Sequence, residues 1–195
     1  MSGGAGRSKS KSLISVPDDL LDEVAKASIK SNTSTSKFVT DALDDAVKMK
    51  SLGYAPADFF QLCQVMQANR VLGGSFVPTE ILRYLTGRAY AEDKETYQAK
   101  WQESGVWYGK FLKDKFEDPL QAFKEFLAVT RWDVNEVEIT RDKTGLIRLR
   151  CISNVLSGEE TELLVKFIEG AVSSMGFRIE KRDYMKGIVA LEMRK

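Results

Sequence analysis

The sequence predicts an α+β protein in which a short strand and two helices precede a larger unit of helices packed on an antiparallel four-stranded sheet. Two observations support this fold class. Apolar residues recur with helical spacing over most of residues 18–131, and from Val134 onward they mostly alternate with polar residues in paired short runs. A period near 3.6 residues indicates a helix with one buried face, whereas a period of two indicates a strand. With 195 residues, the chain is long enough for two domains.

The first segment combines a basic arm with a short strand. Residues 1–12 are mostly Gly, Ser and basic residues, so we expect a flexible arm that carries Lys9 and Lys11. Residues 12–16 form a β-prone run that stops at Pro17, which has no amide hydrogen for a strand ladder and suits the first turn of a helix. A strand followed directly by a helix is therefore predicted.

The following residues predict two helices and a linker. Apolar residues at helical spacing extend to about Lys30, with acidic residues in the first turns, where the helix dipole favours negative charge. The polar cluster 32–36 is typical of caps and turns, and a second amphipathic helix begins there. Residues 51–58 contain a Gly and a Pro and are expected to link residues 13–50 to the unit formed by residues 59–195.

A strand and two helices of this length cannot bury a core alone, whereas two copies can. The paired strands of two copies would form an antiparallel ribbon over four shared helices, and such a ribbon fits the major groove of DNA. The segment 14–47, ISVPDDLLDEVAKASIKSNTSTSKFVTDALDDAV, resembles a ribbon-helix-helix domain of the Arc, MetJ and CopG kind. The resemblance implies a homodimer that binds double-stranded DNA and regulates transcription.

The alternation along the strand predicts which side chains contact DNA. Ile14 and Val16 share one face, as a core requires. Alternate residues from Lys11 to Ser15 form the other face. By the resemblance, this second face contacts the edges of the DNA bases. The polar start of the second helix has free backbone amides that suit a DNA phosphate, and by the same resemblance it is the phosphate clamp. The expected DNA-binding residues are Lys9, Lys11, Leu13, Ser15, Ser34, Thr35 and Ser36.

These features also have plainer interpretations. Residues 34–36 cap a helix in any case, and the basic arm could be a solubilising tail. The same dimer could act as an antitoxin-like or scaffold protein that binds a protein partner, which its acidic helices would tolerate.

The larger unit is predicted to begin with helices and to end with two hairpins around a further helix. The expected elements are helices over 59–72, after Pro78, over 95–116 and over 120–131, hairpins over 134–151 and 177–193, and a helix over 159–175 that Gly176 caps. The ending, GEETELLVKFIEGAVSSMGFRIEKRDYMKGIVALEMRK, resembles the 4-vinyl-reductase type of ligand-binding domain, to which the TRAPP vesicle-tethering subunits are similar in fold. The glycines that carry this resemblance include Gly105, Gly109, Gly158, Gly170, Gly176 and Gly187.

This second resemblance implies a dimerising domain with an apolar pocket between helices and sheet, which relatives use to hold small aromatic or hydrophobic molecules. Aromatic residues are dense in the helices before the sheet, and Trp and Tyr add a polar tip that can orient a ligand. The candidate pocket residues are Trp101, Tyr108, Phe111, Phe126 and Cys151. The alternative is an ordinary core, because helical spacing produces aromatic stripes by default.

The composition excludes several chemistries. Histidine is absent, which removes an imidazole base and every His-containing catalytic or metal site. The two cysteines, Cys63 and Cys151, are too few for a structural zinc cage, and the segment where some relatives bind zinc through cysteines has none. Since no carboxylate or lysine falls in a recognisable catalytic motif, we expect no metal, no cofactor and no enzyme, with a Lys or Glu acting alone left open.

The sequence also predicts a cytoplasmic protein that does not enter membranes. No stretch approaches the roughly 20 apolar residues of a membrane span, and the first residues lack the apolar core of a signal peptide. The expected function is a homodimeric transcriptional regulator that a small hydrophobic or aromatic effector controls. Its rivals are a dimer that acts through protein–protein interaction without a ligand and an enzyme acting on tetrapyrrole or acyl substrates.

Overall fold

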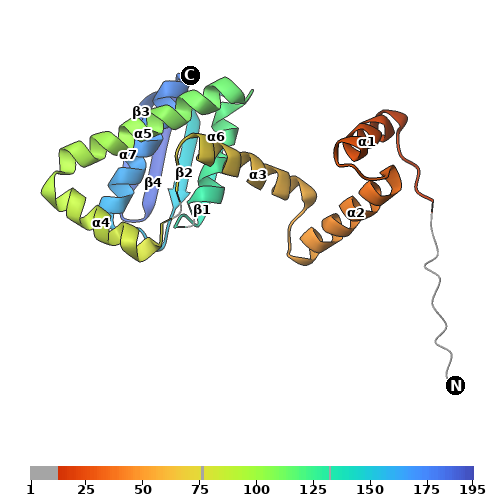
Figure 1. The fold of residues 1–195 in the computed structure, drawn as a ribbon. Coiled ribbons are helices and arrows are strands. Elements are labelled where there is room, and N and C mark those ends of the chain that lie inside the picture. Colours follow the sequence, from red (N-terminus) through yellow and green to blue (C-terminus); the bar gives the residue numbers. More distant parts are fainter. Residues whose placement is uncertain (1–12, 76, 132) are drawn as a thin grey trace. The chain divides into compact units, whose positions relative to one another are not determined.

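The chain divides into two compact units. A computed structural model describes residues 13–75, 77–131 and 133–195. The N-terminal unit is Met1–Phe59 and the C-terminal unit is Phe60–Lys195, so their boundary lies within helix α3 (Pro56–Val71; Figure 1).

The N-terminal unit contains helices α1 (Asp18–Lys30) and α2 (Thr35–Ser51), close to the two predicted helices. Aspartates open α1, and the hydroxyl of Ser34 caps α2. Residues 52–55 connect α2 to α3, a shorter link than the predicted one.

The predicted strand before α1 is not formed in this structure. Residues 13–17 have no regular secondary structure, and the strands of the sheet all belong to the C-terminal unit. The physical reason is that a strand needs hydrogen bonds from a neighbouring strand, and no described segment of the same chain supplies one.

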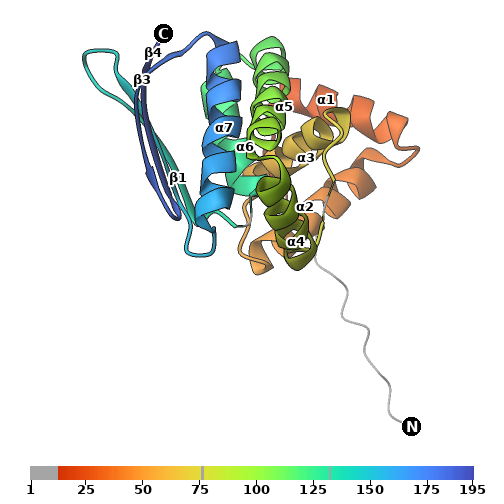
Figure 2. The same ribbon diagram turned by 90° about the vertical axis from the view of Figure 1, so that its left-hand side faces the viewer.

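The C-terminal unit confirms the predicted α+β class and the antiparallel four-stranded sheet. The elements after α3 are α4 (Thr79–Glu92), α5 (Lys94–Lys115), α6 (Pro119–Thr130), β1 (Glu136–Arg141), β2 (Ile147–Ile152), α7 (Gly158–Met175), β3 (Arg178–Met185) and β4 (Ile188–Arg194). The strand order is β1-β2-β4-β3, with each neighbouring pair antiparallel. Figure 2 shows the sheet seen on edge, with α7 between the sheet and α5.

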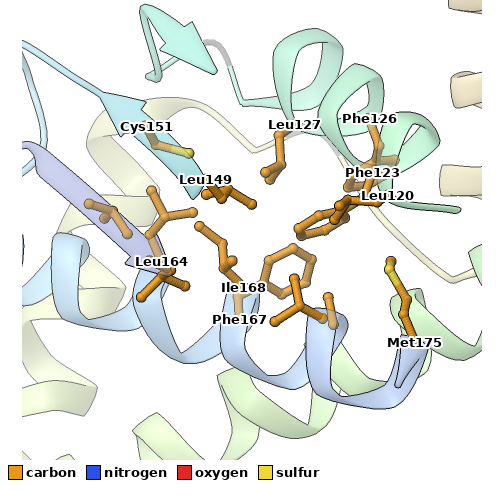
Figure 3. Close-up of a cluster of buried hydrophobic side chains, with 14 of the residues drawn as sticks. Leu120, Phe123, Phe126, Leu127, Leu149, Cys151, Leu164, Phe167, Ile168 and Met175 are labelled. Carbon is orange, nitrogen blue, oxygen red and sulfur yellow. The ribbon is translucent and has the colours of Figure 1, made fainter. Parts of the chain in front are cut away.

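The core lies between the sheet and the layer that contains α6 and α7. Alternate residues of β2 and β4 face it, so Leu149 stands opposite Leu191 and Cys151 opposite Val189. Figure 3 shows side chains from α6, α7 and β2 pointing toward one another, among them Phe123, which is fully buried. The period-two pattern of the sequence therefore corresponds to one buried and one exposed face of the sheet.

Glycines bring α5 and α7 unusually close together. A Cβ added to Gly105 would lie 2.0 Å from the carbonyl oxygen of Phe167, and one added to Gly170 would lie 2.1 Å from that of Gln102. A side chain at either position would force the helices apart, so the missing Cβ atoms determine how closely the two helices pack.

The ends of α7 follow from local sequence signals. Ser157 and Glu160 form a capping box at its start, in which each side chain accepts a hydrogen bond from the other residue's backbone amide. Gly176 ends the helix with φ 101°, the left-handed conformation that the predicted C-cap requires.

Candidate functional site

The start of α2 has exposed polar residues and backbone amides without a partner among the described residues. Ser34 Oγ accepts a hydrogen bond from the amide of Lys37 at 3.3 Å, which leaves the amides of Thr35 and Ser36 without a hydrogen bond among the described residues. Ser36 and Lys37 are exposed, and Thr35 is half-buried with its hydroxyl 3.2 Å from that of Ser28. The structure thus brings the three predicted phosphate-binding residues together at the positive end of a helix dipole.

Lys37 is a residue that the sequence interpretation missed. The first turns of α1 and α7 carry acidic residues, as the helix dipole favours, but the first turn of α2 has none. Lys37 instead adds a positive charge where helix dipoles disfavour it. The signal in the sequence was a lysine three residues after an N-cap serine, a position where glutamate would complete a capping box.

A buried hydroxyl lies beside this site. Thr33 Oγ1 has no hydrogen-bond partner within the described residues, although Thr33 precedes the cap residue of α2 directly. Asn32 next to it adopts the left-handed conformation, with φ 52°. A buried polar group without a partner costs stability unless something outside the chain satisfies it.

The structure does not bring the predicted base-contacting residues onto a strand. Leu13 and Ser15 are exposed and lie in the irregular segment before α1. Lys9 and Lys11 lie outside the described residues.

The N-terminal unit has almost no core. Ser28 is the one described residue of this unit that is buried. The apolar faces that predict two amphipathic helices are partly uncovered: Leu20 is 49% exposed and Val47 68% exposed. The other large exposed hydrophobic residues of this unit are Leu13, Ile14, Val16, Leu21, Ile29, Leu43, Leu52, Tyr54 and Phe59.

The candidate pocket residues belong to the core of the C-terminal unit. Phe126 and Cys151 are buried, whereas Trp101, Tyr108 and Phe111 are half-buried and pack against the core. The Tyr108 ring centre lies 4.8 Å from that of Phe126. A cavity that has Phe126 in its wall measures about 10 Å³, which is about the space that one water molecule needs.

Burial makes the thiol of Cys151 unreactive. Burial raises the pKa of Cys151 to about 12, and the nearby positive charge of Arg131 reduces that shift only in part. Arg131 donates two hydrogen bonds to Asp133, at 2.8 and 2.6 Å. Although burial acts to raise it, the pKa of Asp133 is lowered because this guanidinium stabilises the carboxylate. Cys151 therefore remains a protonated core residue at neutral pH.

Glu162 joins three helices of the C-terminal unit. Its Oε2 accepts hydrogen bonds from Tyr90 of α4 and from Gln98 of α5, the latter at 2.8 Å, and it pairs with the ammonium of Lys94 at 2.9 Å. The Tyr90 and Lys94 hydrogen bonds lower the pKa of the Glu162 carboxyl, while burial opposes them. The Glu162 carboxylate interacts with side chains of the same unit, so this cluster stabilises the packing of α4, α5 and α7.

Two further findings concern metals and membranes. Within the described part of the chain, no group of three or more Asp, Glu and Cys side chains could hold a metal ion. Among the described helices, none combines the length and the apolar character needed to cross a membrane.

Comparisons with known proteins found no relative. No protein-family model matches the chain. A search of curated proteins also found no match.

Proposed function

We propose that the protein is a homodimeric DNA-binding regulator of transcription whose N-terminal unit completes its fold with a second copy. The observation that carries the proposal is the composition of this unit's surface. Its two helices display apolar side chains such as Leu21 of α1 and Leu43 of α2, and Ser28 is its one buried residue among those described. A unit that exposes this much apolar surface is stabilised by a partner that covers it.

A second copy is the partner that fits best. Residues 13–16 lack a strand neighbour within the described chain, and the same residues of another copy would supply one in antiparallel register. Ile14 and Val16 would then lie on one side of the ribbon, over the apolar faces of α1 and α2. A symmetric dimer would therefore give residues 13–16 a hydrogen-bonding neighbour and would also cover the exposed apolar faces of α1 and α2.

The electrostatics of α2 favour DNA as the ligand of this dimer. The start of α2 combines uncapped amides with the exposed cation Lys37, which together suit a phosphate oxygen. A dimer would present two such sites, flanking a ribbon that carries Lys11 and Ser15 on its outer face.

The C-terminal unit would strengthen the dimer and receive the effector. Exposed hydrophobic residues are concentrated on its first two helices, including Phe60 and Met66 of α3 and Ile81, Tyr84 and Leu85 of α4. We expect this surface to pack against the second copy. The proposal includes a small hydrophobic or aromatic effector that binds this unit and changes the affinity for DNA.

One observation favours a second candidate, a dimer that acts through protein–protein interaction without a ligand. The aromatic residues expected to line a pocket pack as core, and the cavity beside Phe126 measures about 10 Å³. A regulator of this kind would need no effector.

Two measurements on the same protein test the proposal. Sedimentation equilibrium should give a dimer, and Leu43→Glu should shift the equilibrium toward monomer because it puts a charge on the apolar face of α2. Lys50→Glu, which adds the same carboxylate near the end of α2, is the matched control.

Fluorescence anisotropy then tests DNA binding. Labelled duplex from upstream of the protein's own gene should bind more tightly than a scrambled duplex, and the affinity should fall with added salt. A dimer that binds neither duplex would contradict the regulator and favour the second candidate.

A further inference from the structure

A second cavity, of about 350 Å³, opens on the surface of the C-terminal unit away from the aromatic core residues. It lies at the end of the sheet near the C mark in Figure 1, between the α5–α6 connection, the β1–β2 hairpin and the end of α7. Its volume is within the range of about 300–1,000 Å³ that is usual for small-molecule sites. None of its lining residues is among the candidate site residues predicted from the sequence.

The floor of this cavity is apolar. Ile147 of β2, Met175 at the end of α7 and Phe177 after it line the cavity and are themselves nearly buried. These side chains are held by the core behind them, so the floor is preformed. An apolar group of a ligand would gain burial there without a rearrangement of the fold.

The rim of the cavity carries charges of both signs. Arg141 and Lys195 supply cations, and Glu117 and Asp118 supply carboxylates. Arg141 Nη2 lies 3.9 Å from Asp118 Oδ2, too far for a hydrogen bond, and both side chains are 57% exposed. The guanidinium of Arg141 therefore keeps its paired donors for a carboxylate, which is the group that it binds best.

Asp118 has one oxygen in use and one available. Its Oδ1 accepts a hydrogen bond from the amide of Gln121 at 3.1 Å and so caps α6. Its Oδ2 is the oxygen nearer to Arg141, at 3.9 Å from Nη2. An ammonium group could pair with this oxygen without loss of the helix cap.

We propose that this cavity binds a small zwitterionic molecule with an apolar side chain, the chemistry of an apolar α-amino acid. The apolar side chain lies on the floor formed by Met175 and Phe177. The carboxylate pairs with Arg141, and the ammonium pairs with Asp118 and Glu117. A rim with charges of both signs favours a ligand with both charges over one with a single charge, because a single charge would leave one set of rim groups unpaired. This inference does not depend on DNA binding.

Isothermal titration calorimetry of the full chain tests the proposal with named probes. We expect L-phenylalanine, L-leucine or L-methionine to bind with a dissociation constant of about 1 mM or below. Phenethylamine lacks the carboxylate and 3-phenylpropionate lacks the ammonium, so each should bind at least about tenfold more weakly than L-phenylalanine. The absence of binding by all three amino acids, or binding of both truncated analogues as tight as that of L-phenylalanine, would overturn the proposal.

Variants locate the binding to this cavity. Arg141→Gln should weaken L-phenylalanine binding about tenfold while leaving the weak binding of phenethylamine unchanged. Asp118→Asn keeps an N-cap acceptor for α6. It should weaken the binding of L-phenylalanine but not the binding of 3-phenylpropionate. Lys143→Gln, in the same hairpin but outside the cavity wall, is the matched control for charge. Amino-acid binding that survives both Arg141→Gln and Asp118→Asn, in variants with an unchanged circular dichroism spectrum, would refute the assignment of the site.

Discussion

Single charged residues make the N-terminal ends of the helices differ from one another. Acidic residues at the starts of α1 and α7 stabilise those helices by pairing with the dipole, and the starts of both could not attract a phosphate. Lys37 at the start of α2 has the opposite effect on the helix, because it costs some helix stability, and in the proposed DNA complex its charge would attract a phosphate.

Lys37→Gln should therefore weaken DNA binding while leaving the fold intact. If Lys37 neutralises one phosphate, the slope of log affinity against log salt should fall by about one unit per contact. Fluorescence anisotropy at several salt concentrations measures the slope. Lys26→Gln, an exposed lysine of α1, is the control, and equal slopes for the two variants would exclude Lys37 from the interface.

Glu162 should make stability depend on pH. Its pKa in the folded protein lies below its ordinary value of 4.5, so the ionised carboxylate stabilises the fold above that value. The contribution is lost as the pH falls through the lowered pKa. Glu162→Gln should be less stable than the parent near neutral pH, and the difference should shrink as the pH falls below 4.5. Urea unfolding at each pH measures it, with the exposed Glu95→Gln as control; a difference that is constant with pH would contradict the assigned role.

At the scale of elements, the contact between α5 and α7 is the tightest constraint in the C-terminal unit. Gly105, Gly109 and Gly170 lie where a Cβ would meet backbone atoms of the facing helix, which cannot rotate away as a flexible side chain could. Gly87 in α4 differs, because a Cβ there would meet open space.

The same substitution should therefore have opposite effects at two glycines. Gly105→Ala should destabilise the protein by about 1–3 kcal/mol, since the added methyl group overpacks the helix contact. Gly87→Ala should stabilise it by up to about 1 kcal/mol through helix propensity alone. Denaturant unfolding measures both, and a neutral or stabilising Gly105→Ala would show that α5 and α7 separate easily.

The elements that could be predicted from the sequence are those with local signals. Ser157 with Glu160, the proline that begins α6 and Gly176 each determine a helix end through contacts within a few residues. The hairpins follow from alternation and a glycine turn, as at Gly145 with φ 78°. Residues 13–16 carry a β-prone sequence, but a strand also requires a neighbour, and the sequence does not say whether the same chain supplies it.

The candidate sites were harder to predict for a related reason. Periodicity indicates which face of a helix is buried, but it cannot indicate whether the space beside Tyr108 or Phe126 is filled. The structure fills it with other side chains. The cavity near Arg141 is formed by four segments far apart in the sequence, and no spacing pattern connects them.

At the scale of the whole molecule, the two units differ in what holds them together. The C-terminal unit has a continuous buried core of its own, while the N-terminal unit has one buried residue among those described. Independent stability is therefore expected of the C-terminal unit alone.

Deletion of residues 1–50 should leave the C-terminal unit folded and abolish DNA binding. Circular dichroism should retain a cooperative thermal transition, because the core of α6, α7 and the sheet is untouched. Anisotropy should show no binding of the duplex that the full chain binds. If the truncated protein bound DNA as tightly as the full chain, the assignment of DNA binding to the N-terminal unit would be wrong.

The exposed helix faces of the N-terminal unit have a consequence for how the protein responds to its own abundance. In the proposed dimer, this unit completes its fold only on meeting a second copy, so this step is bimolecular and the stability of the unit rises with protein concentration. A cell that makes little of the protein would hold monomers whose C-terminal unit is folded and whose N-terminal unit lacks the paired strands. Occupancy of DNA would then rise with about the square of the protein level, which gives the regulator a threshold without any added component.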